Sequence, residues 1–235
     1  NAQVPYYSHG DGVWIRAETS DPFGGDDVSA AELTLTDPYG NVIVGPAPMT
    51  IVDTAGGSRT FEYATTVPAM VSLGMWTATV TAHEGSEGSV WHTKSGLFEL
   101  RGRVTLEQAW GAGASPGDAV VLQIAGGSDA VDGGSTAPAA ATAATAAATA
   151  TTQVSLVQAF TTGDPGGYTI TLSCVRNADG VALATTGAGL TRQVAMPLDS
   201  SVTCTWNNAA TIPLTLVKLA LVRSDPVNGV VNPKA

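Results

Sequence analysis

Short runs in which apolar and polar residues alternate limit the fold of this chain more than any other feature. In the run from residue 75 to residue 83, one face carries the apolar side chains, which are Trp76, Ala78, Val80 and Ala82. The other face carries Thr77, Thr79 and Thr81. A period of two is typical of a β-strand with one buried face. Similar runs recur between turn sequences such as Asp37-Pro38-Tyr39-Gly40, and this pattern predicts an all-β protein.

The strand pattern divides the chain into three parts. Roughly seven strand-like runs lie within residues 1–100, and their spacing suggests an immunoglobulin-like β-sandwich. The pattern restarts near Leu100, so residues 101–210 are expected to form a second β-sandwich, joined to the first by almost no linker. Residues 211–235 are the third part, for which we expect a C-terminal extended strand.

Composition narrows the classes of function. The chain has 235 residues and a net charge of −10, with no basic patch for nucleic acid. The acidic balance also disfavours an anionic membrane surface, and no apolar run of about 18 residues predicts membrane insertion. Only 13% of residues are charged and 27 are glycines, which is typical of β-rich extracellular domains. Because the chain opens on Asn1, we expect a removed signal peptide or an excised fragment of a secreted, cell-surface protein.

The two cysteines bear on the same question of compartment. Cys174 follows the alternating apolar positions Tyr168, Ile170 and Leu172, and Cys204 lies between Val202 and Trp206 on another alternating face. Both thiols should therefore point into a core. One disulfide formed in an oxidising compartment is the simplest interpretation, and a pair of buried free thiols is the alternative.

The most unusual stretch is STAPAAATAATAAATATTQ, residues 135–153. Alanine favours a helix, but no stripe of large apolar residues and no capping box accompany it. The recurring threonines favour a strand, and the tract lacks the polarity of a solvated linker. We predict an extended strand of small residues that another β layer can approach closely, with a helix or a loop as alternatives.

Motifs for catalysis are missing. Neither G-x-S-x-G nor H-E-x-x-H occurs, so the chain is not predicted to be an enzyme and no cofactor is expected. One exception is calcium, which the oxygens of a glycine-containing loop with Asp21, Asp26 and Asp27 can bind. His83, Glu84, Glu87 and His92 have no zinc-ligand spacing, so they are interpreted as a solvated hairpin end rather than a metal site.

Tryptophans offer an alternative function. Trp76 and Trp206 fall on apolar faces and are expected in the core. Trp91 and Trp110 are less constrained by their neighbours and can stack on sugar rings. An adhesin or carbohydrate-binding surface module is therefore the alternative to a structural role.

The C-terminal run TIPLTLVKLALV, residues 211–222, reads as a strand without a sandwich to enter. Leu214 and Leu216 lie on one of its faces, Leu219 and Leu221 lie on the other, and Lys218 stands between them. An unpaired apolar strand is an aggregation hazard unless something pairs with it. It is expected either to begin a following module or to link subunits by strand addition.

Several stretches resemble modules of large bacterial secreted surface proteins. SDPFGGDDVSAAELTLTDPYGNVIV and GMWTATVTAHEGSEGSVWHT are similar to an immunoglobulin-like module of these proteins. VTLEQAWGAGASPGDAVVLQIAGG, the Ala/Thr tract and SVTCTWNNA followed by PLTLVK resemble prealbumin-like repeat modules. LTLVKLALVRSDPVNGVVNPKA resembles the opening of the conserved repeat domain that follows them. The resemblance implies stalk or matrix components without common catalytic residues.

One departure from the resembling modules concerns an internal crosslink. Prealbumin-like pilin modules of Gram-positive bacteria often join a first-strand lysine to a last-strand asparagine through an isopeptide bond. Asn207 or Asn208 can supply the acceptor, but Gln108 stands where the lysine would be. An internal isopeptide bond is therefore not expected, and the disulfide should act as the covalent link instead.

These observations predict a non-enzymatic structural subunit of a bacterial extracellular fibre or cell-surface stalk. Its expected partners are copies of itself in a homopolymer, or following modules of a larger surface protein. The subunit-linking strand is predicted to contain Leu214, Leu216, Lys218, Leu219 and Leu221.

Overall fold

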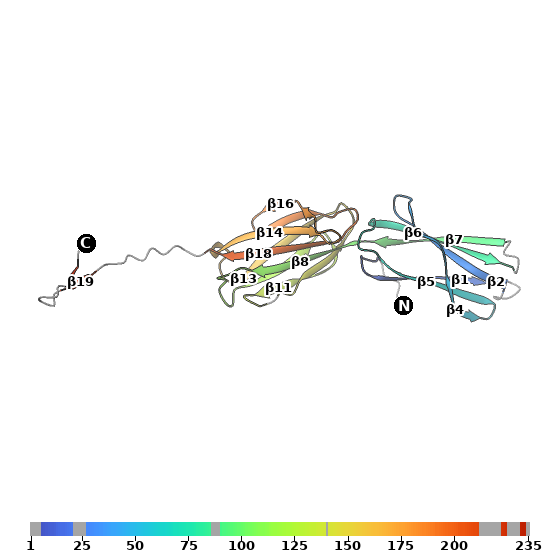
Figure 1. The fold of residues 1–235 in the computed structure, drawn as a ribbon, viewed down its shortest axis with the longest axis horizontal. Helices are drawn as coiled ribbons and strands as arrows, with labels where there is room; N and C mark the ends of the chain where they lie inside the picture. Colours follow the sequence, from blue (N-terminus) through green and yellow to red (C-terminus); the bar gives the residue numbers. More distant parts are fainter. Residues whose placement is uncertain are drawn as a thin grey trace.

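The computed structural model describes residues 6–20, 27–85, 90–139 and 141–211, together with the backbone of residues 222–224 and 231–233. The fold is all-β, as the alternation predicts, with a short 3₁₀ turn at η2 (Pro165–Gly167). Two β-sandwiches follow each other along one long axis (Figure 1). None of the described residues forms a helix long and apolar enough to cross a membrane.

The first sandwich is built from a three-stranded and a four-stranded sheet. The smaller sheet has the order β1 (Gly12–Ser20), β5 (Ser58–Thr66), β4 (Thr50–Ala55). The larger has the order β3 (Val42–Pro48), β2 (Val28–Thr36), β6 (Gly74–Glu84), β7 (Val90–Leu100). The inward faces bury Leu33, Phe61 and Trp76 to 3% exposure or less, so the predicted alternation of β6 places its core face correctly.

The second sandwich pairs a six-stranded sheet with a five-stranded sheet. The six-stranded order is β10 (Ser128–Val131), β12 (Ala144–Ala148), β8 (Gly102–Trp110), β18 (Val202–Ala210), β14 (Tyr168–Arg176), β15 (Ala182–Leu183). The five-stranded order is β11 (Gly133–Thr136), β9 (Ala119–Ala125), β13 (Gln153–Thr162), β17 (Thr191–Ala195), β16 (Thr185–Ala188). β8 and β18 are parallel neighbours, from the pair Val104–Val202 to the pair Trp110–Asn208.

The Ala/Thr tract supplies β12, the strand between β10 and β8. Ala144, Ala146 and Ala148 are at most 3% exposed, and Ala147 on the opposite face is also buried. Gly133 shows how close the neighbouring chain comes, because an added Cβ there would lie 2.3 Å from the Thr142 carbonyl oxygen. Small side chains thus let other β segments approach both faces of the strand. The predicted extended conformation is observed at Ala144–Ala148, whereas turns occupy residues 137–139 and 150–151 of the tract.

Enlarging one of these alanines should destabilise the second sandwich. Ala146→Leu adds volume to a filled site and is expected to lower the free energy of unfolding by about 1–3 kcal/mol. Ala159, which is exposed on β13, is a matched control. Ala159→Leu should change stability by less than about 0.5 kcal/mol. Denaturant unfolding of both variants measures the change in the free energy of unfolding. Equal changes in the two variants would contradict tight packing around Ala146.

The stretch between Gly126 and Gly134 has the glycines and aspartates typical of a loop, but it is largely strand. β10 and β11 occupy most of it, and they pair with β12 and β9 respectively. Glycine and aspartate have low strand propensity, so the local sequence does not indicate these strands. They are extended because they pair with strands that lie elsewhere in the chain.

The junction between the sandwiches is short and held by polar contacts. Arg101 alone separates β7 from β8, and its amide N–H donates to the Tyr7 carbonyl at 2.8 Å. The Leu73 amide donates to the Leu198 carbonyl at 2.7 Å, across the two sandwiches. A Cβ added at Gly102 of the second sandwich would lie 3.0 Å from Leu73 Cδ1 of the first, so the two sandwiches approach closely here. The two bodies therefore meet through fitted surfaces rather than through a linker.

His9 adds a titratable contact to the junction. Its Nε2 lies 3.2 Å from the Val71 carbonyl oxygen, which only accepts, so Nε2 carries the proton. Its Nδ1, 3.1 Å from Ser201 Oγ, then accepts from that hydroxyl. Burial lowers the pKa of His9, against smaller opposing effects of the Val71 carbonyl and of Asp199.

Because the folded protein favours the neutral form of His9, lowering the pH should decrease the free energy of unfolding. The unfolded chain takes up this proton near pH 6.5 and the folded chain only at lower pH, so stability is present above pH 6.5 and falls below it. The melting temperature should therefore drop more between pH 7 and pH 5 in the native protein than in His9→Gln. Parallel pH profiles for the two proteins would show that His9 is not the cause.

Beyond the second sandwich, the structure describes only two short strands. β19 (Val222–Ser224) pairs antiparallel with β20 (Val231–Pro233). Leu214, Leu216, Lys218, Leu219 and Leu221 lie outside the described residues.

Candidate functional site

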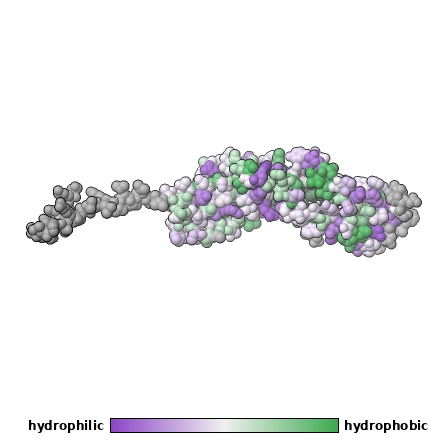
Figure 2. All heavy atoms as spheres, viewed as in Figure 1, coloured by the Kyte–Doolittle hydropathy of each residue, from purple (hydrophilic) through white to green (hydrophobic). Residues whose placement is uncertain are grey.

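An open groove lies between the two sheets of the first sandwich. It has a volume of about 850 Å³. Its walls are the edge strands β1, from Ile15 to Ser20, and β7, from His92 to Gly96. Hydrophobic surface elsewhere forms separate patches rather than one continuous band in the view of Figure 2. The groove, rather than an exposed hydrophobic patch, is therefore the feature of the first sandwich that can accept a binding partner.

The groove exists because the two sheets are unequal. β1 ends the three-stranded sheet and β7 ends the four-stranded sheet, and no described strand pairs with the outer edge of either. Contacts between the sheets place β1 against β6 and β5 against β2. β7 lies one strand beyond β6, which faces β1, and no described strand lies beside β1 in the smaller sheet to cover it.

The floor of the groove comes from the inward positions of β6 and β7. Register pairs Ala78 with Gly96, Val80 with Lys94 and Ala82 with His92, and paired residues share a face. Ala78 and Val80 are only half-buried although they lie on the core face. Apolar core surface is therefore left open along this side.

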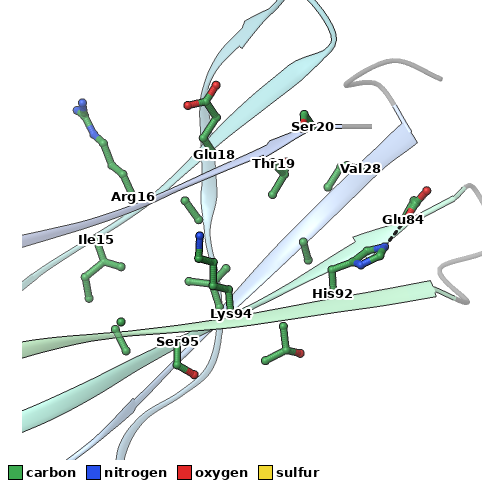
Figure 3. A pocket seen from close by; sticks show the side chains of 16 residues that line it. Ile15, Arg16, Glu18, Thr19, Ser20, Val28, Glu84, His92, Lys94 and Ser95 are labelled. Atoms are coloured by element: carbon green, nitrogen blue, oxygen red, sulfur yellow. Dashed lines mark hydrogen bonds and ion pairs between the residues drawn. The ribbon is translucent and has the colours of Figure 1, made fainter. Parts of the chain in front are cut away.

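Charged groups line one end of the groove. Figure 3 shows Lys94 rising from β7 towards β1, and Ile15 pointing down from β1. His92 Nε2 lies 2.5 Å from Glu84 Oε2 at the outer end. An inward-pointing lysine is a common protection for an open sheet edge, because it disfavours indiscriminate pairing.

Gly96 gives the groove its depth near the junction. A Cβ added to Gly96 would meet no atom within 4 Å. Its neighbour Leu97 points to the opposite side of β7 and is 69% exposed. A larger residue at position 96 can thus fill the groove without displacing the fold.

The predicted disulfide is formed. Cys174 on β14 and Cys204 on β18 are directly paired and at most 2% exposed, with a sequence separation of 30. The bond joins neighbouring strands of one sheet and does not cross between the sheets. No free cysteine remains in the chain.

The calcium prediction concerns a loop that is mostly outside the described residues. Asp21 and Asp26 are not described, and Asp27 is half-buried next to β2. Within the described residues no group of three or more metal-ligating side chains is present. Calcium binding at Asp21, Asp26 and Asp27 stays a prediction.

The two tryptophans considered for sugar binding lie in different surroundings. Trp91 is 62% exposed, and its ring lies 4.5 Å from that of His83. Trp110 packs edge-on against Phe160 and Tyr168, and its Nε1 donates to Ser135 Oγ at 2.8 Å. Only Trp91 has the open ring that a sugar platform needs.

Gln108 occupies the first-strand position that the resemblance singled out. It is buried on β8, directly beside Trp206 of the parallel strand β18, and it accepts a hydrogen bond from Gln158 Nε2. Asn208 is fully buried two residues further along β18, whereas Asn207 is exposed. Amide groups therefore occupy this part of the core.

Comparison with known proteins gives only distant structural neighbours. No protein-family model and no curated protein matches the chain. The group B streptococcus pilus 2b backbone protein is 11% identical, with a TM-score of 0.30 over 90% of this chain and 98% of that one. The major pilin of Streptococcus pyogenes is 11% identical, with a TM-score of 0.32 over 86% of this chain and 100% of that one. Domains D2 and D3 of the major pilin SpaD from Corynebacterium diphtheriae are 10% identical, with a TM-score of 0.33 over 87% of this chain and 96% of those domains. At these TM-scores the likenesses carry no weight for the function of this chain.

Proposed function

We propose that this chain is a non-enzymatic structural subunit of a bacterial extracellular fibre or stalk, and that subunits join through β-strand contacts. The end-to-end junction of the two sandwiches carries the proposal. A single residue between β7 and β8, with direct backbone hydrogen bonds across the junction, makes a stiff rod of two units. Stiff repeated units suit a load-bearing protein.

Two further features support the proposal. A buried disulfide in the second sandwich suits an oxidising, extracellular location. The outer edge of β1, and that of β7 before its bridge to Tyr7 at Leu100, carry no described strand and offer backbone donors and acceptors for strand addition. The apolar run after Thr211 has the composition expected of such a strand.

Removal of residues 211–235 tests the proposal. Electron microscopy of the full chain should show filaments, and the truncated chain should remain as single particles. The first sandwich should unfold at an unchanged temperature, because none of its described contacts involves these residues. Filaments of unchanged length after truncation would contradict assembly through this segment.

A further inference from the structure

The groove in the first sandwich fits a strand that the chain itself encodes. We propose that the groove between β1 and β7 accepts the segment IPLTLVKLAL, residues 212–221, of a second copy as an additional strand, antiparallel to β1. This rests on the proposed function as a fibre subunit and names the acceptor of its linking strand. The added strand would complete the smaller sheet and cover the half-buried floor at Ala78 and Val80.

Distance along the rod requires the second copy. β7 and β8 run along the same long axis (Figure 1), so the fourteen residue-to-residue steps from Gly96 to Trp110 cover roughly 45 Å. Trp110 lies beside Asn208, near the end of β18, where the segment begins. Fully extended, the chain from Thr211 to Leu221 spans at most about 35 Å. The segment therefore cannot reach the groove of its own chain.

Direction follows from the same geometry. The segment leaves the end of the second sandwich that is remote from the junction, because β18 runs parallel to β8. β1 runs away from the junction and ends at Ser20. In a second copy placed in line, the Ser20 end of the groove therefore faces the segment that leaves the first copy. A strand that enters there runs antiparallel to β1. Successive copies then extend the rod in one direction.

Charge and apolar pattern select one face and one register. Lys94 lies on the groove floor, which disfavours an inward Lys218. The face with Val217, Leu219 and Leu221 is apolar at every second position and enters instead. Placing Leu219 opposite the inward Ala17 then puts Lys218 opposite Glu18 on the outer face. Opposite charges at such a pair stabilise strand pairing.

The test uses the full chain and two pairs of matched variants. Gly96→Tyr fills the groove, and Leu97→Tyr adds the same ring to the outer side of β7. Leu219→Asp changes the entering face, and Leu216→Asp changes the outer face. Gly96→Tyr and Leu219→Asp should each raise the concentration needed for assembly, measured by light scattering and negative-stain microscopy, by at least about tenfold. Leu97→Tyr and Leu216→Asp should assemble as the native chain does.

Cysteine crosslinking locates the strand without relying on loss of assembly. Both native cysteines are in the disulfide, so Ala17→Cys combined with Leu219→Cys adds the only free thiols. Oxidised fibres of this variant should give a ladder of covalent oligomers on a denaturing gel, whereas Ala17→Cys with Leu216→Cys should not.

The outcomes separate the acceptor site from the fibre function. Native fibres that persist in Gly96→Tyr, or a ladder only from the Leu216 combination, would overturn the groove assignment and leave the fibre function standing. A native chain that never assembles would overturn both. Loss of assembly in the groove and entering-face variants alone, with the predicted ladder, establishes the site.

Discussion

Replacing Cys174 and Cys204 together with alanine should lower the free energy of unfolding of the second sandwich by about 3–4 kcal/mol. The bond closes a loop with a sequence separation of 30 residues, and its loss restores that freedom to the unfolded chain. Loss of the two buried sulfurs adds to the effect. Differential scanning calorimetry should show the transition of the second sandwich shifted downwards.

The first sandwich supplies the internal control for this experiment, because it contains neither cysteine. Its transition should stay within a few degrees of that of the native chain. Unfolding of the native protein in a strong reductant should reproduce most of the loss. A double variant that loses less than about 1 kcal/mol would show that the bond does not constrain the unfolded chain.

Trp206→Ala should lower the free energy of unfolding of the second sandwich by a similar amount. The side chain is fully buried on β18, and its truncation leaves a cavity in a packed core. Large aromatic truncations of this kind lower the free energy of unfolding by about 3–5 kcal/mol. Denaturant unfolding followed by circular dichroism measures the change.

Trp206→Phe separates packing from hydrogen bonding. The Trp206 Nε1 has no hydrogen-bond partner among the described residues, so phenylalanine removes no bond and retains most of the ring contacts. We expect it to lose much less stability than alanine does. Equal losses would show that the indole N–H, rather than ring packing, stabilises the site.

Local alternation explains which parts of the fold could be predicted. Cys174 and Cys204 were assigned to core faces because each lies in register with large apolar neighbours two residues away, and the structure pairs them directly. The Ala/Thr tract was predicted as extended because its residues are too small to build a helical apolar stripe. Both arguments use only neighbours in sequence. The cysteine prediction is confirmed, and the prediction for the tract is confirmed for its central strand, Ala144–Ala148.

Strand order accounts for what could not be predicted. The groove depends on β1 pairing with β5 and β7 pairing with β6, so that no described strand covers either outer edge and β7 is bridged only at Leu100, by Tyr7. No local pattern in residues 12–20 or 90–100 indicates that neither strand has a second partner. Gly96 was likewise unremarkable in sequence, since its open surroundings arise only when distant strands are placed.

The parallel pairing of β8 with β18 has a mechanical consequence. The chain enters the second sandwich at the start of β8 and leaves it at the end of β18, at opposite ends of the same pair of strands. Tension along a fibre would therefore slide the two strands past each other lengthwise. Their backbone hydrogen bonds, from Val104 to Trp110, would bear that load together instead of breaking one after another. Shear of this kind is the direction in which a β ladder resists extension most strongly.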